Sequence, residues 1–321
     1  ISKDVVMPIN WIIGYYFFKN HPIEKKKKKK TITVYQDKTK FPKKIKRFSE
    51  FPISVEMNKP YLNADVEMKH EKQNSKLLLD LGNTDSVWLF PSLIKDFIYN
   101  RPNIDDFLGR GFSGDIFGKR SRINSLSIGK FKLNKPLASM PDEVSIQHLN
   151  LVKDRKGSIR SEVLRRFTLI LDYPENKLYL QSNKNINDPF LIDGSGLEIR
   201  QDGLLWEKEE VQVKTAKMNS SSNETNVIDN SPDKFQYKFT LKPIFIVSGT
   251  RKDSPAQKVG ILKDDKLISI DKKVAKDLTL NKIHQILKTD VSRQINLEIQ
   301  RNGIPMKFDF TLEDPIPYIE E

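Results

Sequence analysis

The sequence predicts a mainly β protein, and two observations support that fold class. Apolar and polar residues alternate with a period of two in several separate stretches, which is typical of strands with one buried face. Segments with the helical period are few and short. The alternating apolar positions are Leu62, Ala64, Val66 and Met68, then Leu169, Leu171 and Tyr173, then Leu178 and Leu180, then Ile295, Leu297 and Ile299, and finally Met306, Phe308, Phe310 and Leu312.

Two short helices and one irregular segment complete the pattern. Residues 161–167 are predicted to form one helix. Residues 279–288 are predicted to form another, with Asp277 or Thr279 as its N-cap and with its leucine and isoleucine side chains on one face. Residues 218–234 are polar and show no periodicity, so we expect a disordered insertion there.

Composition and charge exclude several classes of protein. The chain has 321 residues, which favours about two domains, and it has no cysteine, so disulfides, thiolate zinc sites and cysteine nucleophiles are excluded. The net charge of +13 is concentrated at the start, because residues 1–50 hold 14 Lys and Arg against 4 Asp and Glu. The lysine run at residues 25–30 fits a solvated hairpin better than a polyanion-binding patch, since no stacking aromatics are interleaved with it. No nucleic-acid partner is therefore expected.

Several common functional motifs are absent or incomplete. The four histidines are isolated from one another and no His-Glu-x-x-His motif occurs, so no metal site is expected. No Gly-x-Ser-x-Gly nucleophile motif is present. Residues 109–114 match Gly-x-Gly-x-x-Gly, but another glycine follows where a helix should continue, so a glycine loop is favoured over nucleotide binding. The apolar stretch from Val5 to Phe18 is too short for a membrane span, and we expect no transmembrane segment and no cofactor.

The most informative segment is residues 75–90. Three leucines lead into Asp80, and Gly82 follows before a second apolar run. An acidic residue at the end of a buried strand is costly to desolvate unless it is hydrogen-bonded or takes part in chemistry. Asp-x-Gly is also a common turn sequence. The residues by themselves therefore leave a structural turn and a reactive carboxylate as equal alternatives.

Residues 75–90 resemble the active-site loop of the retropepsin-like aspartic peptidases, in which an apolar strand leads into Asp-Thr/Ser-Gly. Residues 157–180 resemble the end of such a lobe, where an apolar segment ending in glycine, a short helix and a closing hairpin brace the aspartate loop. The resemblance implies that Asp80 is catalytic and that Leu81 and Gly82 complete its loop. It also implies a brace at Ile159 and Arg160, and a flap over the substrate that contains Gly111, Gly114 and Gly118.

Residues 11–35 show the same pattern as the end of that lobe, with an apolar segment ending in glycine, a short helix and a hairpin. The resemblance therefore implies two related lobes. Residues 1–48 would be the last part of a first lobe, and residues 49–185 would be the second. Aspartic peptidases hold two carboxylates against one water and share one proton between them. Because this chain offers Asp80 alone, the resemblance implies that the second catalytic aspartate precedes Ile1 or comes from a second copy in a homodimer.

Two residues depart from the family pattern. Leu81 replaces the Thr or Ser whose hydroxyl ties the two active-site loops together. Arg160 replaces the glycine of the brace, next to the aspartate loop. An inactive scaffold therefore stays open as an alternative to the enzyme.

Residues 193–314 resemble a PDZ domain of the bacterial type. The likeness rests on Ile244–Val247, on Ser254-Pro255-Ala256, and on the helix expected at residues 279–288. PDZ domains bind an extended peptide as an added strand beside their second helix. The usual Gly-Leu-Gly-Phe-like loop is not evident, and residues 237–241 are expected in its place. The peptide-binding residues that the resemblance implies are Phe239, Leu241, Ile283 and Leu287.

These features predict an aspartic-type endopeptidase that acts on peptides or proteins, with a PDZ module that binds a peptide or the substrate. The alternative is an inactive peptidase-like scaffold that works as a PDZ peptide-binding protein. In either case the groove could instead bind another part of the same chain. The family resemblance suggests an extracytoplasmic location.

Overall fold

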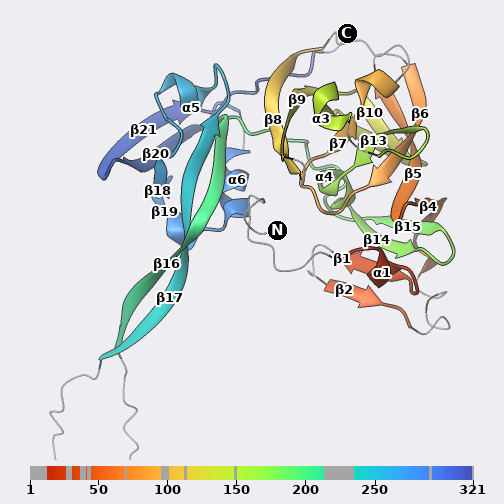
Figure 1. Ribbon diagram of the computed structural model, residues 1–321, viewed down its shortest axis with the longest axis horizontal. Helices are drawn as coiled ribbons and strands as arrows, with labels where there is room; N and C mark the ends of the chain where they lie inside the picture. Colours follow the sequence, from red (N-terminus) through yellow and green to blue (C-terminus); the bar gives the residue numbers. More distant parts are fainter. Residues whose placement is uncertain are drawn as a thin grey trace, which may run out of the picture.

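The computed structural model is mainly β, as the sequence predicts, and its described strands form three sheets (Figure 1). The insertion expected at residues 218–234 and part of the lysine run lie outside the described residues. Within the described part of the chain, no helix is long and apolar enough to cross a membrane. The structure describes residues 13–26, 31–36, 41, 45–68, 71–94, 101–111, 114–147, 150–212, 235–288 and 291–319.

The first sheet joins the start of the chain to strands that follow residue 48. Helix α1 (Tyr15–Phe18) precedes it, and the Phe18 ring stacks on Tyr173 at 5.6 Å between centroids. Strands from residues 1–48, the segment expected to end a first lobe, thus share a sheet with strands of the expected second lobe. The boundaries of the two lobes stay a prediction. The antiparallel order is β2 (Thr31–Val34), β1 (Ile23–Lys26), β14 (Phe167–Asp172), β15 (Lys177–Ser182) and β3 (Ser49–Pro52).

The second sheet holds the strands between residues 54 and 159. Its apolar side chains and those of β14 and β15 form one buried cluster. The short helices η1 (Pro91–Leu93), α3 (Glu143–Ile146) and α4 (Ser161–Leu164) lie around it, and α4 is shorter than the helix expected at residues 161–167 because β14 begins at Phe167. The strand order is β11 (Phe131–Asn134), β10 (Ser125–Ile128), β5 (Lys59–Met68), β6 (Glu71–Leu79), β13 (Arg155–Ile159), β7 (Val87–Leu89), β12 (Leu137–Pro141), β9 (Gly114–Arg122) and β8 (Asn103–Gly111), with β4 (Ser54–Glu56) beside β5.

The order of three strands in this sheet positions the loop that contains Asp80. Strand β13 lies between β6 and β7, parallel to β6 and antiparallel to β7. The chain therefore leaves β6, passes the end of β13 and returns to the sheet as β7. Gly157 permits the close approach of β13 and β7, because a Cβ there would lie 1.9 Å from the Trp88 carbonyl oxygen. The loop between β6 and β7 is thus fixed at both ends and faces the segment that follows β13.

The glycines of the expected flap have different roles. Strands β8 and β9 form an antiparallel hairpin in which Gly111 pairs with Gly114 next to the tip. Gly118 lies inside β9 and is buried, and a Cβ there would stand 2.2 Å from the Met140 carbonyl oxygen on β12. The expectation that Gly118 belongs to a mobile cover is therefore corrected. Its small size serves the close packing of β9 on β12.

Gly118→Ala should lower the free energy of unfolding by about 1–3 kcal/mol, the usual cost of overpacking a rigid interior. The Met140 carbonyl belongs to the neighbouring strand, so it cannot move away without disturbing the sheet. Urea unfolding followed by circular dichroism measures the change. Gly14→Ala is the control, because a Cβ at Gly14 meets no atom within 4 Å. Unchanged stability of the Gly118 variant would contradict the packing role.

The third sheet belongs to the C-terminal part of the chain, which has its own buried apolar cluster and is therefore built as a separate domain. Helices α5 (Pro255–Lys258), η2 (Ala275–Asp277) and α6 (Leu280–Leu287) accompany the sheet, and α6 confirms the helix expected at residues 279–288. The strand order is β16 (Leu197–Gln212), β17 (Phe235–Thr250), β18 (Lys266–Ile270), β20 (Gln294–Arg301) and β21 (Ile304–Thr311), with β19 (Lys273–Val274) beside β18.

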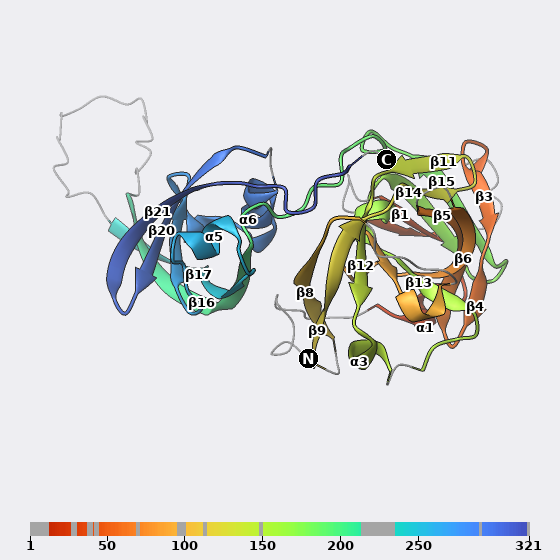
Figure 2. The same ribbon diagram turned by 90° about the horizontal axis from the view of Figure 1, so that it is seen from above.

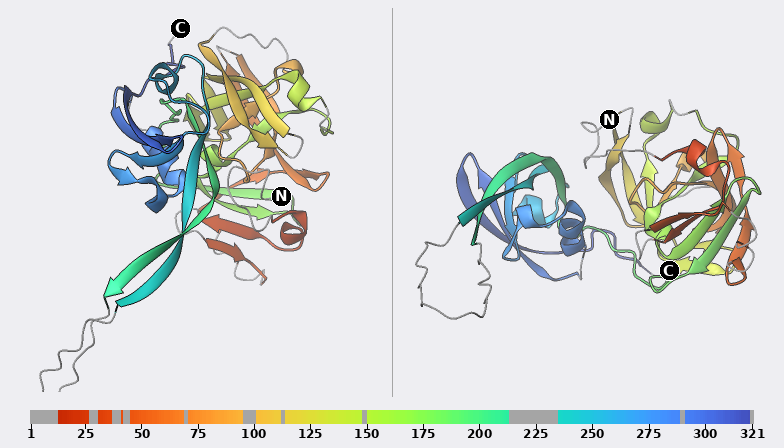
Figure 3. Two further views of the ribbon diagram at one scale, coloured as in Figure 1. Left: turned by 60° about the vertical axis from the view of Figure 1, so that its left-hand side comes forward. Right: turned by 90° about the horizontal axis from the view of Figure 1, so that it is seen from below.

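The distal halves of β16 and β17 extend beyond the rest of this domain as a two-stranded ribbon (Figure 3). We call residues 203–212 and 235–243 the arm. The two domains are connected by two chain segments, one before β16 and one after β21 (Figure 2). Arg122 binds both segments, because its Nη1 donates to the Phe190 carbonyl at 2.8 Å and its Nε donates to the Ile316 carbonyl at 3.1 Å.

Candidate active site

Asp80 lies in the loop between β6 and β7. Its backbone N–H donates to the Ile159 carbonyl at 2.9 Å, and its Oδ1 accepts a hydrogen bond from the Gly82 N–H at 2.9 Å. The second contact closes the tight turn that Asp-x-Gly favours. The side chain remains 28% exposed, so the carboxylate is held in position and is still accessible. One conformation therefore accommodates both roles that the sequence leaves open for Asp80.

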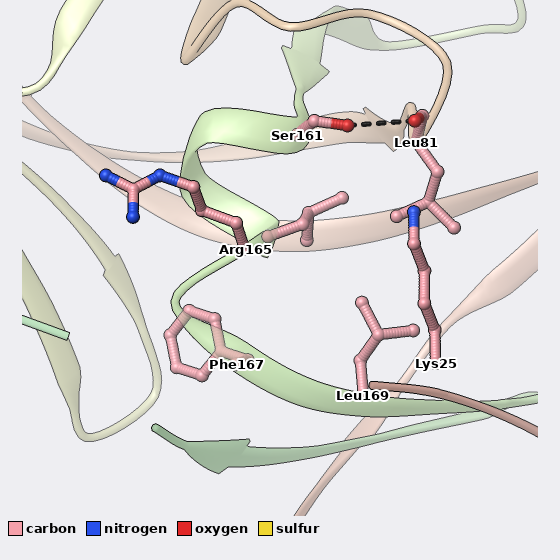
Figure 4. Close-up of a pocket in the computed structure, with 7 residues that line it drawn as sticks. Lys25, Leu81, Ser161, Arg165, Phe167 and Leu169 are labelled. Carbon is pink, nitrogen blue, oxygen red and sulfur yellow. Dashed lines mark hydrogen bonds between the residues drawn. The ribbon is translucent and has the colours of Figure 1, made fainter. Parts of the chain in front are cut away.

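The segment that follows β13 braces this loop by hydrogen bonds. The Arg160 N–H donates to the Ser86 carbonyl at 2.9 Å, and the Ser161 N–H donates to the Asn83 carbonyl at 3.0 Å. The Ser161 hydroxyl also donates to the Leu81 carbonyl at 2.8 Å, as Figure 4 shows. The structure thus brings together the aspartate loop and the brace residues that the sequence singles out, although they are far apart along the chain.

The Leu81 side chain lines a small, mostly apolar pocket (Figure 4). Phe167 and Leu169 from β14 line the same pocket, and so does Lys25 from β1. Burial lowers the pKa of Lys25. A hydroxyl at position 81 would offer a hydrogen bond here, whereas Leu81 offers an apolar contact. The pocket is where the segment before residue 48 meets the aspartate loop.

Arg160 lies against the Asp80 carboxylate and is largely buried. Its Nη2 is 3.7 Å from Asp80 Oδ2, its Nε donates to Ser158 Oγ at 3.0 Å, and its guanidinium carbon is 3.5 Å from the centroid of the Trp88 ring. Burial lowers the pKa of Arg160 to about 10, and the attraction of Asp80 and Asp85 opposes this shift. Arg160 is therefore charged at neutral pH. Stacking on Trp88 is what accommodates an arginine at this position.

A second carboxylate of the loop, Asp85, is buried in a network of hydrogen bonds. Its Oδ1 accepts from Arg120 Nη1 at 2.6 Å, and its Oδ2 accepts from Ser139 Oγ at 2.7 Å and from Trp88 Nε1 at 2.8 Å. Burial alone would raise the pKa of Asp85, but Arg120 and these two hydrogen bonds lower it to about 2. Arg120 on β9 also pairs with Asp106 on β8. The network therefore ties the aspartate loop to both strands of the hairpin β8–β9.

Sequence reasoning did not single out Asp85 or Arg120. The signal that was available is an aspartate two residues before the apolar run 87–90, where a buried acid needs a partner. The partner itself could not be found, because Arg120 is 35 positions away on another strand. In the described ranges, no cluster of three or more His, Asp or Glu side chains is placed to bind a metal ion.

In the C-terminal domain, the start of β16 lies beside α6. Within the described strands, β16 pairs with β17 alone, so its other edge is free for a further strand. The His284 ring lies beside the Ile199 backbone, and the Gly194 N–H donates to the Leu287 carbonyl at 3.1 Å. These contacts hold α6 close to the free edge of β16.

The turn before β16 binds a carboxylate of its own chain. Asp193 Oδ1 accepts from the Ser195 N–H at 2.9 Å and from the Gly196 N–H at 3.1 Å. The Leu197 N–H donates to Ser195 Oγ at 3.0 Å. Burial raises the pKa of Asp193, and the Ser195 hydrogen bonds oppose this shift. The backbone N–H groups of this turn are thus already occupied from within the chain.

The four residues expected to line a peptide groove occupy two different places. Phe239 and Leu241 lie on the arm, and about half or more of each side chain is exposed. Ile283 and Leu287 are fully buried in the apolar cluster of the domain. Residues 237–241 were expected in place of the glycine loop, and this expectation is corrected. The position of that loop, directly before the edge strand that lies beside α6, is held by the glycine-containing turn before β16.

Comparison with known proteins identifies one domain. Residues 246–301 match the family model of the PDZ domain, so the C-terminal part of the chain contains a PDZ domain. No curated protein matches the sequence.

Solved structures with similar folds are distant. A retropepsin-like aspartic protease from Rickettsia conorii is 18% identical, with the match covering 41% of this chain and 98% of that one and a TM-score of 0.27. Conglutin gamma, a basic 7S globulin from lupine seeds, is 12% identical over 50% of this chain and 56% of its own, with a TM-score of 0.31. An HtrA-type protease with a decapeptide is 12% identical over 86% and 81%, with a TM-score of 0.26. With scores this low, none of these likenesses bears on function.

Proposed function

We propose that the chain is an aspartic-type endopeptidase in which Asp80 is one catalytic carboxylate and the PDZ domain binds peptide or protein substrates. The observation that carries the proposal is the position of Asp80. An accessible carboxylate is held rigidly by Gly82 on a loop that the segment after β13 braces. General acid–base catalysis requires an acid held within reach of the substrate in this way.

In the proposed reaction, an ionised carboxylate takes a proton from a water molecule while the water oxygen attacks the scissile carbonyl carbon. A second carboxyl, which is protonated, donates its proton to the carbonyl oxygen. Asp80 supplies one of these two groups. Arg160 forms an ion pair with Asp80, and the charge of Asp80 also acts on Arg155. The proposal requires a second carboxyl, supplied by a residue outside the described ranges or by a second copy of the chain.

The PDZ domain would present the substrate as an added strand on the free edge of β16. The C-terminal carboxylate of a peptide would gain little binding energy at the turn before β16, because Asp193 already accepts hydrogen bonds from the N–H groups of Ser195 and Gly196. An internal extended segment of an unfolded protein needs only the free strand edge for binding. As ligands of the PDZ domain, such segments are therefore favoured over free C-termini.

The contact between Arg160 and Asp80 favours a second candidate, an inactive scaffold that binds peptides through its PDZ domain. The aspartic mechanism needs two carboxyl groups that share one proton. A guanidinium 3.7 Å from one carboxylate offers it an ion pair instead of the shared proton. Asp80 would then serve as a turn former that fixes the lobe.

Incubation of the full chain with a mixture of peptides in ¹⁸O-labelled water, analysed by mass spectrometry at several pH values, separates the two candidates. An aspartic endopeptidase produces internal cleavage, and each new carboxyl group carries the label because one of its oxygens comes from water. The scaffold leaves every peptide intact and retains some of them. Intact peptides at every pH would remove the enzymatic proposal and leave the second candidate.

A further inference from the structure

The arm of the PDZ domain has two chemically different faces. In its antiparallel register, Leu204 lies opposite Pro243 and Trp206 lies opposite Leu241. Because opposite residues of an antiparallel pair share a face, the large apolar side chains gather on one side of the ribbon. We call this side the apolar face. Its residues with described side chains are Leu204, Trp206, Lys208, Tyr237, Phe239, Leu241 and Pro243, and the same register continues through Glu210, Gln212 and Phe235.

The apolar face is open to solvent within its own domain. Trp206, Phe239 and Tyr237 leave 65%, 61% and 51% of their surface exposed, and Leu204 and Leu241 leave 52% and 47%. Lys208 adds one charge to this face, and its ammonium lies 3.4 Å from the centroid of the Tyr237 ring, a cation–π contact. A contiguous apolar surface of this kind marks an interaction site.

The opposite, polar face of the arm is held against the domain. Lys242 Nζ donates to Asp277 Oδ1 at 2.9 Å, and Glu207 forms an ion pair with Lys276. Asp277 and Lys276 belong to η2, so these two contacts turn the polar face of the arm toward η2 at its root. The apolar face therefore points away from η2 and is left for another molecule. A two-stranded ribbon without further packing is only marginally stable in water, which adds a reason for a partner.

We infer that the apolar face is a dimer interface that is covered by the same face of a second copy of this chain. Aromatic side chains offer roughly 150–250 Å² each. About half to two thirds of that surface is still exposed here, so the three aromatic residues and two leucines of two copies together would bury at most on the order of 1,000 Å². That area reaches the lower limit of a specific interface. Interfaces between identical chains are more apolar than other interfaces, and a twofold axis lets one patch meet itself. The inference does not depend on the proposed peptidase activity.

A membrane is a less suitable occupant. Surfaces that bind anionic membranes place several Lys or Arg beside the inserted apolar side chains. In the described part of the apolar face the only cation is Lys208, and its ammonium is held over Tyr237.

Sedimentation analysis of the full chain tests the inference. Wild type should form a dimer with a dissociation constant on the order of 10 µM, as expected of a small interface. The double variant Trp206→Ser, Phe239→Ser should weaken the dimer at least about tenfold, because exposed aromatic residues dominate such interfaces. Leu205→Ser is the matched control, since Leu205 is 53% exposed on the opposite face of the same strand, and its dimer should be unchanged. Circular dichroism confirms that each variant is folded.

Three outcomes would overturn the inference. Wild type could remain monomeric at concentrations well above the expected dissociation constant. Leu205→Ser could weaken the dimer as much as the double variant does, which would place the interface elsewhere. Monomeric wild type could cosediment with vesicles of phosphatidylserine and phosphatidylcholine while the double variant does not, and the occupant would then be a membrane.

Discussion

Asp80→Asn should abolish peptide hydrolysis, with kcat/KM falling by about 10²–10⁴-fold or more, the range that one general acid or base contributes. Asparagine matches aspartate in size, and its side-chain oxygen can still accept the hydrogen bond from the Gly82 N–H. The turn therefore persists in the variant. A neutral amide cannot accept a proton from the attacking water, so the chemical step is lost while the fold is kept. Initial rates with a cleaved peptide, measured beside an unfolding curve, show whether the two effects are separated.

Asp65→Asn is the matched control for this change. Asp65 lies on β5 in the same domain and forms an ion pair with Lys72, whose side chain is 60% exposed. Exposed pairs of this kind contribute about 0–1 kcal/mol to stability, so kcat/KM and the free energy of unfolding should both stay near their wild-type values. Wild-type hydrolysis by the Asp80 variant would assign the reaction to another group and end the role proposed for Asp80.

The strands and the longest helix could be predicted from the sequence because their signals are local. The alternation at Leu169 and Leu171 identifies β14, and the spacing of Leu280, Ile283 and Leu287 identifies α6. The helix expected at residues 161–167 is shorter in the structure, since its last residues continue into β14. Periodicity reports which side chains are buried together, and it does not mark where one element ends and the next begins.

The roles of individual side chains depend on contacts that no local pattern reports. Asp80 could be identified because strand, acid and glycine are adjacent in the sequence. Arg160 could be seen to replace a glycine, but its stacking on Trp88 depends on β13 lying beside β7. Gly118 shares its residue type with the glycines of the hairpin tip, and only the neighbouring strand shows that it is a packing position.

Asp85→Ala should destabilise the domain that contains Asp80 by about 3–5 kcal/mol, the usual cost of removing one member of a buried ion pair. Arg120 would keep its contact with Asp106 but lose the carboxylate that faces it at 2.6 Å. The Ser139 hydroxyl and the Trp88 ring N–H would also lose their acceptor. Urea unfolding at neutral pH measures the loss. Asp105→Ala is the control, because the Asp105 side chain is 89% exposed and its pairing with Lys119 should contribute little.

The pH dependence of the stability lost in Asp85→Ala shows whether the loss comes from the ion pair or from packing alone. The pKa of Asp85 is about 2 in the folded protein against an ordinary value of 3.8. A carboxyl group whose pKa is lowered by folding adds stability that is fully present above its ordinary value and is lost as pH falls through its folded value. At 1.36 kcal/mol per pH unit, the shift corresponds to about 2 kcal/mol. The difference in unfolding free energy between wild type and Asp85→Ala should therefore shrink by about 2 kcal/mol between pH 4 and pH 2. Other carboxyl groups titrate in both proteins and largely cancel in this difference, so a constant difference across that window would mean that Asp85 is not ionised in the fold.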